Sequence, residues 1–355
     1  MTSPSRARLT IDLDALAHNR AVLVAQAWGA EVAAVVKADG YGLGAGPISR
    51  RLWAEGTRSF FVARLSEGEA LRNDLQDRLA TIYVLDGLLP DTVDRLRVSR
   101  LTPVISTWGQ VEAARDVKPI VAALQVDTGM NRQGLTPSEA LEVANALGGL
   151  KINLLVSHLG SATNPHEPRN EQQLAVFRGV REGFPQIPAS FAASAGAFLG
   201  PAYRYDMIRA GISLYGGGPE ERPDARLKAV ATLTAPILDI RRIGPGDRVG
   251  YGANFTADKP MRIAVVAAGY ADGVIRAGMG RGRAWVAGAL RPVLAINMDL
   301  TVIDLGRSGP AMGSQVELLG PNVLLDAVAE AAGTVAHEVL VRLGSRAERV
   351  YVGVA

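Results

Sequence analysis

The feature that most constrains the fold is a rhythm of short β-rich runs over the first two thirds of the chain. Eight runs occur, in the order "EVAAVVK", "SFFVARL", "TIYVLDG", "LTPVIS", "IVAALQVDTG", "KINLLVSHLG", "PASFAAS" and "YDMIRAGISLYG". Helix-like segments such as "SEGEALRNDL" and "TPSEALEVANAL" fill most of the gaps. Eight strands alternating with helices predict a parallel α/β barrel. An open doubly wound sheet is the alternative, but the chain has no GxGxxG after the first strand and no six-strand break.

After about residue 218 the sequence pattern changes to one of closely spaced strands and turns. Examples are "AVATLTAPILDIRRIGPGDRVGYG", "MRIAVVAAGYADG" and "SQVELLG". This spacing predicts an antiparallel β-domain, joined to the barrel by the linker "GPEERPDARL". At 355 residues the chain exceeds the usual size of a single core. We therefore place the barrel at 9–222 and the β-domain at 223–355.

Composition excludes several classes of function. Hydrophobic residues make up 48% and charged residues 21%, which is typical of a soluble globular protein. The net charge of +3 comes from dispersed arginines without a basic block, so we expect no nucleic-acid partner. The chain has no cysteine, and its four histidines lack metal-ligand spacing, so we expect no metal. Neither an apolar signal core nor a membrane-length apolar run is present, and we expect a cytoplasmic protein.

Lys37 stands out because it ends an apolar run. Five of the six residues before it are Val or Ala, which suits a strand buried on both faces. A lysine at the mouth of such a core is partly desolvated, and desolvation favours the neutral amine. A neutral amine is a nucleophile and a base, able to form a Schiff base with an aldehyde. The alternative is a strand-end lysine whose amine reaches solvent.

Arginine, histidine and serine residues end the later barrel strands, and a glycine and an isoleucine follow the last of them. Because active-site residues of barrels lie at the carboxyl ends of the strands, these residues are predicted to converge on the mouth that holds the lysine. They are Arg132, His158, Ser194, Arg209, Gly211 and Ile212. Taken singly, the histidine could be a core residue, the serine a helix cap, Arg209 a surface ion-pair member and the glycine a bend. Their joint occurrence favours a site.

The sequence resembles the alanine racemase family over nearly its whole length. "AVVKADGYGLGA" is similar to that family's pyridoxal-phosphate lysine motif. The blocks "DTGMNRQG", "SHLG", "RAGISLYG", "VGYGANFTA", "GYADG", "NMDLTVID" and "ERVYVG" follow in the family's order. The resemblance implies an eight-stranded α/β barrel followed by a β-domain, with a short N-terminal strand around 8–11 that joins the second domain. It also implies pyridoxal 5'-phosphate as cofactor, an amino-acid substrate and a homodimer.

The resemblance assigns two bases to the reaction. Racemisation removes the Cα proton on one face and returns a proton on the other, which one base cannot easily do. Lys37 would bind the cofactor as a Schiff base and act on one face. Tyr251, supplied by the partner chain, would act on the other; the alternative is an ordinary strand aromatic. A phenol needs a lowered pKa for this task, which the resemblance assigns to positive charge from His158, itself bonded to Arg209.

The remaining matched positions surround the cofactor and substrate. The phosphate would be held by two tyrosine hydroxyls, a serine and two amides, namely Tyr41, Tyr351, Ser194, Gly211 and Ile212. Arg209 would face the pyridine nitrogen, and Arg132 would bind the substrate carboxylate and the cofactor's phenolic oxygen. The partner's Met298 amide and Asp299 would approach the same carboxylate. Tyr270 would narrow the entrance or serve as a structural tyrosine.

Several positions depart from the family pattern. Gln125 stands where many members carry a carbamylated lysine that orients the arginine, and a glutamine carries no charge, so a bound anion could help instead. Ala193, Ala295 and Asn297 also differ from common family residues. These departures leave three alternatives to a dedicated alanine racemase: a racemase of broader specificity, a decarboxylase on the same barrel, and a cofactor carrier without turnover. The decarboxylase needs a cysteine, which the chain lacks, and the carrier would lack the β-domain.

The first prediction is that the purified protein is yellow and that Lys37→Ala abolishes the colour, because the amine would bind the cofactor covalently. Absorbance scanning and borohydride trapping followed by peptide mapping measure this. A colourless wild-type protein with no reducible adduct at Lys37 would contradict the cofactor assignment.

Overall fold

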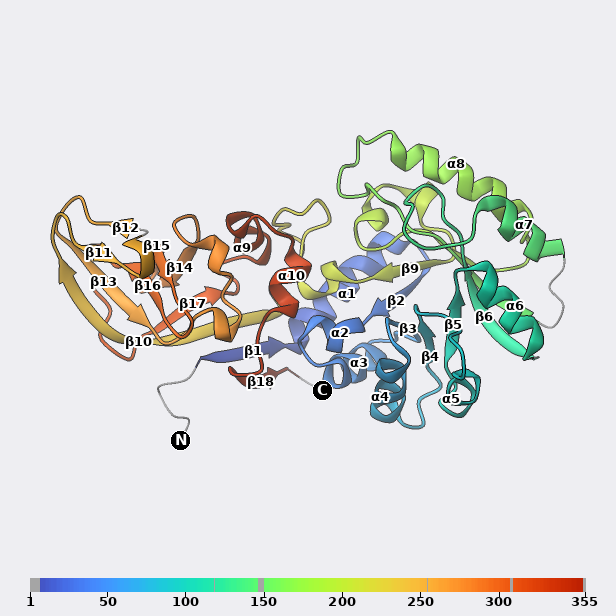
Figure 1. Ribbon diagram of the computed structural model, residues 1–355, viewed down its shortest axis with the longest axis horizontal. Helices are drawn as coiled ribbons and strands as arrows, with labels where there is room; N and C mark the ends of the chain where they lie inside the picture. Colours follow the sequence, from blue (N-terminus) through green and yellow to red (C-terminus); the bar gives the residue numbers. More distant parts are fainter. Residues whose placement is uncertain (1–6, 118, 146–149, 254, 307–308, 354–355) are drawn as a thin grey trace. The chain divides into compact units, whose positions relative to one another are not determined.

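The computed structural model describes residues 7–353 except 118, 146–149, 254 and 307–308 (Figure 1). The chain groups into two compact units. The barrel unit comprises residues 17–40 and 44–214, and the β-unit comprises 1–16, 41–43 and 215–354. The linker predicted at 218–227 falls inside the β-unit, where the Gly218 amide donates to Asp326 Oδ2 at 2.9 Å.

The barrel unit contains eight parallel strands in sequential order, as the sequence predicted. They are β2 (Glu31–Val35), β3 (Ser59–Val62), β4 (Thr81–Val84), β5 (Thr102–Ile105), β6 (Ile120–Gln125), β7 (Leu150–Val156), β8 (Ala189–Ser190) and β9 (Met207–Ala210). β9 pairs with β2, and a parallel bridge from Ala193 to Arg209 joins the end of β8 to β9. The sheet therefore closes into a barrel.

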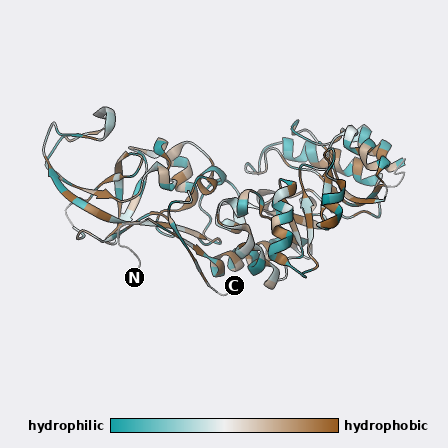
Figure 2. Ribbon diagram, turned by 60° about the horizontal axis from the view of Figure 1, so that its bottom comes forward, coloured by the Kyte–Doolittle hydropathy of each residue, from teal (hydrophilic) through white to brown (hydrophobic). Residues whose placement is uncertain are grey.

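One helix precedes the first barrel strand, and the others lie between successive strands from β2 to β8 (Figure 1). Their bounds are α1 (Leu13–Ala27), α2 (Lys37–Tyr41), α3 (Ala45–Ala54), α4 (Leu65–Leu75), α5 (Val93–Val98), α6 (Trp108–Asp116), α7 (Pro137–Asn145) and α8 (Arg169–Glu182). Buried strand residues such as Phe61, Val104 and Leu154 fill the barrel interior. Figure 2 shows brown, hydrophobic strands beside helices that carry both colours, as expected when a helix buries one face. Within the described residues, no helix combines the length and apolarity needed to cross a bilayer.

The β-unit is built on one long, mostly antiparallel sheet. Its strands are β1 (Arg8–Asp12), β10 (Ala231–Ile243), β13 (Met261–Val266), β14 (Arg283–Val286), β15 (Ala289–Ile296), β16 (Thr301–Asp304), β17 (Gln315–Leu319) and β18 (Glu348–Val352). The long strand β10 pairs with β17 along one half and with β13 along the other, which closes part of the sheet on itself. β11 (Arg248–Val249) and β12 (Phe255–Thr256) form a separate hairpin, and α9 (Leu325–Ala332) and α10 (Ala336–Val341) complete the unit.

The N-terminal strand joins this sheet, as the family resemblance implied. β1 pairs antiparallel with β10 and parallel with β18. Leu9 and Ile11 are fully buried, so alternate side chains of the strand enter the core of the β-unit. The first described residues of the chain therefore fold with its last ones.

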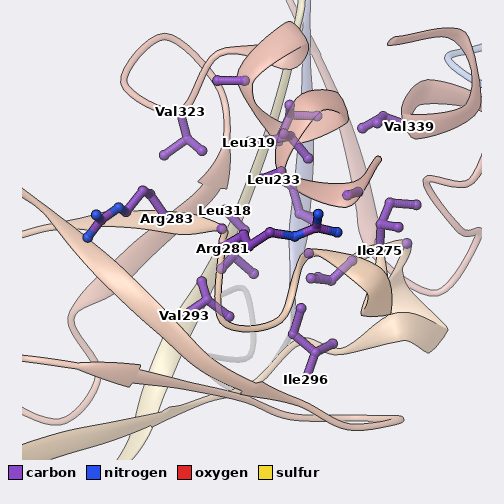
Figure 3. A pocket seen from close by; sticks show the side chains of 18 of the residues that line it. Leu233, Ile275, Arg281, Arg283, Val293, Ile296, Leu318, Leu319, Val323 and Val339 are labelled. Atoms are coloured by element: carbon purple, nitrogen blue, oxygen red, sulfur yellow. The ribbon is translucent and has the colours of Figure 1, made fainter. Parts of the chain in front are cut away.

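The β-unit also encloses an apolar cavity of ≈ 100 Å³ (Figure 3). Its walls come from β10, β15, β17, α9 and α10, with Leu233, Val293 and Leu318 among the aliphatic side chains. Arg281 and Arg283 are its charged members, and it contains none of the site residues predicted above. We therefore treat the cavity as a packing feature of the core.

Two glycines in the cavity wall should respond oppositely to replacement by alanine. A Cβ at Gly278 would meet its nearest neighbour, Ala332 Cβ, at 4.0 Å, so Gly278→Ala should stabilise the protein by about 0.4–1 kcal/mol through the unfolded chain. Gly273 has φ +100° and its Cβ would lie 2.6 Å from the Arg342 carbonyl oxygen, so Gly273→Ala should destabilise by at least about 1 kcal/mol. Thermal and denaturant unfolding measure both. A stabilising Gly273→Ala would contradict the backbone described here.

Candidate functional site

Lys37 lies in an unusual turn just past the first barrel strand. β2 ends at Val35, two residues earlier than the sequence suggested, and Lys37 opens α2. The next residues, Ala38, Asp39 and Gly40, are left-handed, with φ of 52°, 55° and 63°. This conformation costs about 1–2 kcal/mol for each non-glycine residue. The surrounding contacts must therefore hold the turn in place.

Backbone and side-chain hydrogen bonds hold this turn. The Gly40 amide donates to the Val36 carbonyl at 2.9 Å, and Asp39 Oδ1 accepts from the Ala45 amide at 2.8 Å. The Ala38 amide donates to Glu67 Oε1 at 2.8 Å. Glu67, on α4, was not singled out from the sequence, where it looks like an ordinary first-turn glutamate.

The environment of Lys37 favours its neutral amine. Burial lowers the pKa of Lys37, the positive charge of Arg132 lowers it further, and the carboxylate of Glu67 raises it in part. The side chain is half-buried, so it is both desolvated and reachable. This is the environment that the sequence predicted for a nucleophilic lysine.

Arg209 lies inside β9 and is almost completely buried. Its Nη1 donates to the Ser190 carbonyl at 2.8 Å and to Ser190 Oγ at 2.7 Å. Its Nη2 donates to the Ser157 carbonyl at 2.6 Å and contacts His158 Nδ1 at 3.2 Å. Burial, with a further effect of Arg132, lowers the pKa of Arg209 to about 10, so the guanidinium remains charged at neutral pH. Among the described residues, Nε has no hydrogen-bond partner and remains able to donate.

The contact with Arg209 determines the protonation of His158. A guanidinium can only donate, so Nδ1 must accept and the imidazole proton lies on Nε2. In this arrangement the ring can offer a hydrogen bond through Nε2, and the positive charge beside it is that of Arg209.

A buried polar network supports the histidine loop. Gln173 Nε2, on α8, donates to the His158 carbonyl at 3.0 Å and to Thr128 Oγ1 at 3.2 Å. Gln173 Oε1 accepts from the Gly160 amide at 2.8 Å, and Thr128 Oγ1 lies 2.9 Å from Ser157 Oγ. Gln173 was not singled out from the sequence, where it looks like an ordinary helical glutamine.

Ser194 organises the loop that follows β9. Its Oγ accepts from the Gly211 amide at 2.9 Å and from the Ser213 amide at 3.3 Å. The hydroxyl proton is then free to be donated elsewhere. The Gly211 amide, expected to face an anion, is engaged by Ser194, whereas the Ile212 amide has no acceptor within the described ranges. Ser194 and Ile212 are thus the donors that remain available here.

Two further predicted residues, Tyr41 and Tyr351, belong to the β-unit. The Tyr41 ring packs against Tyr215, with centroids 4.7 Å apart. Burial raises the pKa of Tyr41, so its hydroxyl stays protonated and can donate. The Tyr351 hydroxyl donates to the Leu43 carbonyl at 2.9 Å. These contacts attach residues 41–43 to the β-unit.

The β-unit brings four predicted residues together in an open hollow of ≈ 1090 Å³. Tyr251, Tyr270, Met298 and Asp299 all line it. Tyr251 is 80% exposed and Met298 54%, which is unusual for large apolar side chains. The Met298 carbonyl accepts from the Ala271 amide at 2.9 Å, which ties two of the predicted sequence blocks to each other.

An arginine that the sequence did not reveal pairs with Asp299, one of the residues that line this hollow. Arg346 donates to Asp272 Oδ1 at 2.7 Å and also pairs with Asp299. Both carboxylates raise the pKa of Arg346. Asp272 in turn accepts from the Gly269 amide at 2.9 Å. The negative charge of Asp299 is therefore countered from within its own unit.

The departures from the family pattern have visible consequences. Gln125 is buried, and its Nε2 donates to the Gln133 carbonyl at 2.9 Å. Arg132 is exposed and makes no hydrogen bond to any described residue. A Cβ added to Gly250 would lie 2.9 Å from the Cβ of Ala295. Ala295 therefore packs beside the residue that precedes Tyr251. The Asn297 carbonyl accepts from the Tyr270 amide at 3.0 Å.

Comparisons with known proteins agree with this geometry. Residues 11–219 match the model of the alanine racemase N-terminal domain, and residues 230–351 match that of the C-terminal domain. An alanine racemase of Methylobacterium nodulans is 44% identical over 362 residues, covering 99% of this chain and 97% of that protein. A catabolic alanine racemase of Agrobacterium fabrum is 41% identical, covering 97% and 92%.

A solved structure shares the whole architecture. The crystal structure of alanine racemase from Bartonella henselae, with covalently bound pyridoxal phosphate, superposes with a TM-score of 0.92 at 34% identity. The match covers 98% of this chain and 99% of that one.

The closed parallel barrel, with Lys37 and the buried Arg209 near the carboxyl ends of its strands, defines an α/β-barrel class of enzyme. The closed β-unit follows it in the chain. Within that class, the chain belongs to the alanine racemase family, a family of isomerases.

Replacing Arg132 should change the protonation of Lys37. Arg132→Gln removes one of the two causes that lower the lysine pKa, so the pH at which Lys37 becomes neutral should rise. Competitive amine labelling of the ligand-free chain across pH, read by mass spectrometry, measures this midpoint. Arg95→Gln is the control, because Arg95 pairs with Glu69 and does not influence Lys37. Equal midpoints in both variants would show that Arg132 does not act on the lysine.

Proposed function

We propose that the protein interconverts L- and D-alanine with pyridoxal 5'-phosphate bound at Lys37. The observation that carries the proposal is the desolvated Lys37 amine at the carboxyl edge of the barrel that also holds the buried Arg209. The related B. henselae structure carries the cofactor covalently. When bound, pyridoxal phosphate supplies a carbonyl that joins an amine and a ring that delocalises charge from Cα.

The available donors fit this cofactor. Ser194 Oγ and the Ile212 amide can donate to its phosphate, and Gly211 supports Ser194 rather than the anion directly. The protonated hydroxyl of Tyr41 is a further candidate donor, whereas the Tyr351 hydroxyl would first have to leave the Leu43 carbonyl. Arg209 offers Nε–H to the pyridine nitrogen. Because an arginine gives up no proton there, it limits how much charge the ring withdraws and so disfavours side reactions.

Lys37 and Tyr251 are the proposed bases. The neutral amine of Lys37 takes or returns the Cα proton on one face. Tyr251 of the partner subunit performs the same task on the other, in a homodimer with shared sites. The high exposure of Tyr251 in an open hollow supports a surface that a partner covers. His158 would assist that phenol with its Nε2–H, since a hydrogen bond to a phenolate lowers the pKa of the phenol.

Arg132 and the hollow of the β-unit bind the substrate in this proposal. Arg132 is exposed and offers a planar pair of donors for the alanine carboxylate. The partner's Met298 amide is a second donor, and Tyr270 narrows the entrance. Asp299 does not repel the carboxylate, because Arg346 neutralises it.

The physiological role we propose is supply of D-alanine for peptidoglycan in the cytoplasm. The catabolic name of the A. fabrum relative marks alanine breakdown as the competing role. A second candidate is a racemase of broader specificity, favoured by the uncharged Gln125 near an arginine that no described residue holds. Racemisation assays across a panel of L-amino acids separate these activities. A cofactor carrier without turnover is disfavoured, because it would have no use for the β-unit.

The shared site is tested by mixing two inactive variants. Lys37→Ala and Tyr251→Phe homodimers should each lose at least about 100-fold in kcat, because each keeps one base. When the two variants are unfolded and refolded together in equal amounts, about half of the dimers contain one chain of each. Each of these mixed dimers has one intact site. About a quarter of wild-type activity should return.

The controls are each variant and the wild type refolded alone. If both bases came from one chain, every site would keep one lesion and mixing would restore nothing. A mixture no faster than its separate components would therefore overturn the shared site, whereas an inactive wild type would overturn the racemase itself.

A further inference from the structure

The carboxylate of Glu67 connects the turn after Lys37 to the start of helix α4. Glu67 Oε1 accepts from the Ala38 amide at 2.8 Å. Glu67 Oε2 accepts from the Ala63 amide at 2.7 Å and from the Arg64 amide at 3.1 Å. The two oxygens thus act on different segments, one following β2 and the other preceding α4.

Capping of α4 explains only half of these bonds. A glutamate at the third helical position commonly reaches back to the first free amides, and Oε2 does this for Ala63 and Arg64. Oε1 is not needed for the cap. Oε1 instead accepts from the amide of Ala38, the first left-handed residue after Lys37, where the backbone of the turn is strained.

Glu67 also acts on the lysine through its charge. The groups that influence the Lys37 amine are Arg132, from the loop after β6, and Glu67, from α4. Asp39, on the turn itself, is engaged by the Ala45 amide. Removing the Glu67 charge therefore lowers the pKa of Lys37 further, whereas keeping the charge on a shorter side chain changes it less.

We propose that Glu67 is a positioning residue: its carboxylate clamps the left-handed turn so that Lys37 is held at the barrel mouth. The catalytic part of this inference rests on the proposed racemase function. The clamping part concerns the turn alone.

Two variants of Glu67 separate the effect of side-chain length from the effect of its negative charge. Glu67→Gln keeps the length but has a single acceptor oxygen, so it cannot serve both Ala38 and the α4 amides. Glu67→Asp keeps the charge but is too short to bridge the two segments. Glu69→Gln is the matched control, because Glu69 lies on the same helix and pairs with Arg95 instead.

Hydrogen–deuterium exchange of the holoenzyme reads the clamp without using activity. In peptides that cover residues 36–44, Glu67→Gln and Glu67→Asp should raise the exchange rate about tenfold or more, because the Ala38 amide loses its acceptor. Glu69→Gln should match the wild type. Unchanged exchange in both Glu67 variants overturns the clamp, whether or not the protein is a racemase.

The pH profile of kcat, which reports groups of the enzyme–substrate complex, reads the charge of Lys37. Glu67→Gln should move the limb assigned to Lys37 toward lower pH and lower the maximum about tenfold, whereas Glu67→Asp should lower the maximum with little shift. A merely structural role would lower the rate without moving the limb. An unmoved limb in Glu67→Gln overturns the electrostatic role; if that variant does not fold, the exchange and rate of Glu67→Asp decide the clamp, and a wild-type result there overturns it.

Discussion

Burial of positive charge at the carboxyl edge of the barrel is the constraint on which the site depends. Arg209 is almost without solvent, and four contacts from its two terminal nitrogens compensate for the lost hydration. Lys37 has no such set of acceptors among the described residues, so burial shifts it toward the neutral amine instead. The two cations are thereby given different tasks. One stays charged and fixed, and the other becomes reactive.

The hydrogen bonds of the arginine extend its influence beyond its own position. By occupying His158 Nδ1, Arg209 forces the imidazole into the tautomer with its proton on Nε2. Gln173 then holds the same loop from the opposite side through the His158 carbonyl. The direction in which this histidine can donate is therefore set by groups that never need to touch a substrate. Buried Thr128 and Gln173, from two other segments, complete the hydrogen bonds around this loop.

Much of the fold and part of the site could be predicted from sequence. The spacing of apolar runs gave the eight parallel strands, and the apolar residues before Lys37 gave its desolvation. Glu67, Gln173 and Arg346 could not be found in this way. Each acts on a segment far away in the chain, and each looks in the sequence like an ordinary polar residue of a helix or loop. Local pattern carries no information about such partners.

What the sequence determined by itself is the periodicity of its strands and helices, hence the barrel and the β-unit, and the identity of the residues at the strand ends. These depend on local spacing and on the free energy of burying apolar side chains. Only the tertiary structure decided the contact of His158 Nδ1 with Arg209, the engagement of Gly211 by Ser194 and the left-handed turn after Lys37. Protonation and strained backbone depend on which donors, acceptors and charges the folded chain brings within a few ångströms, and contacts between distant segments make that selection.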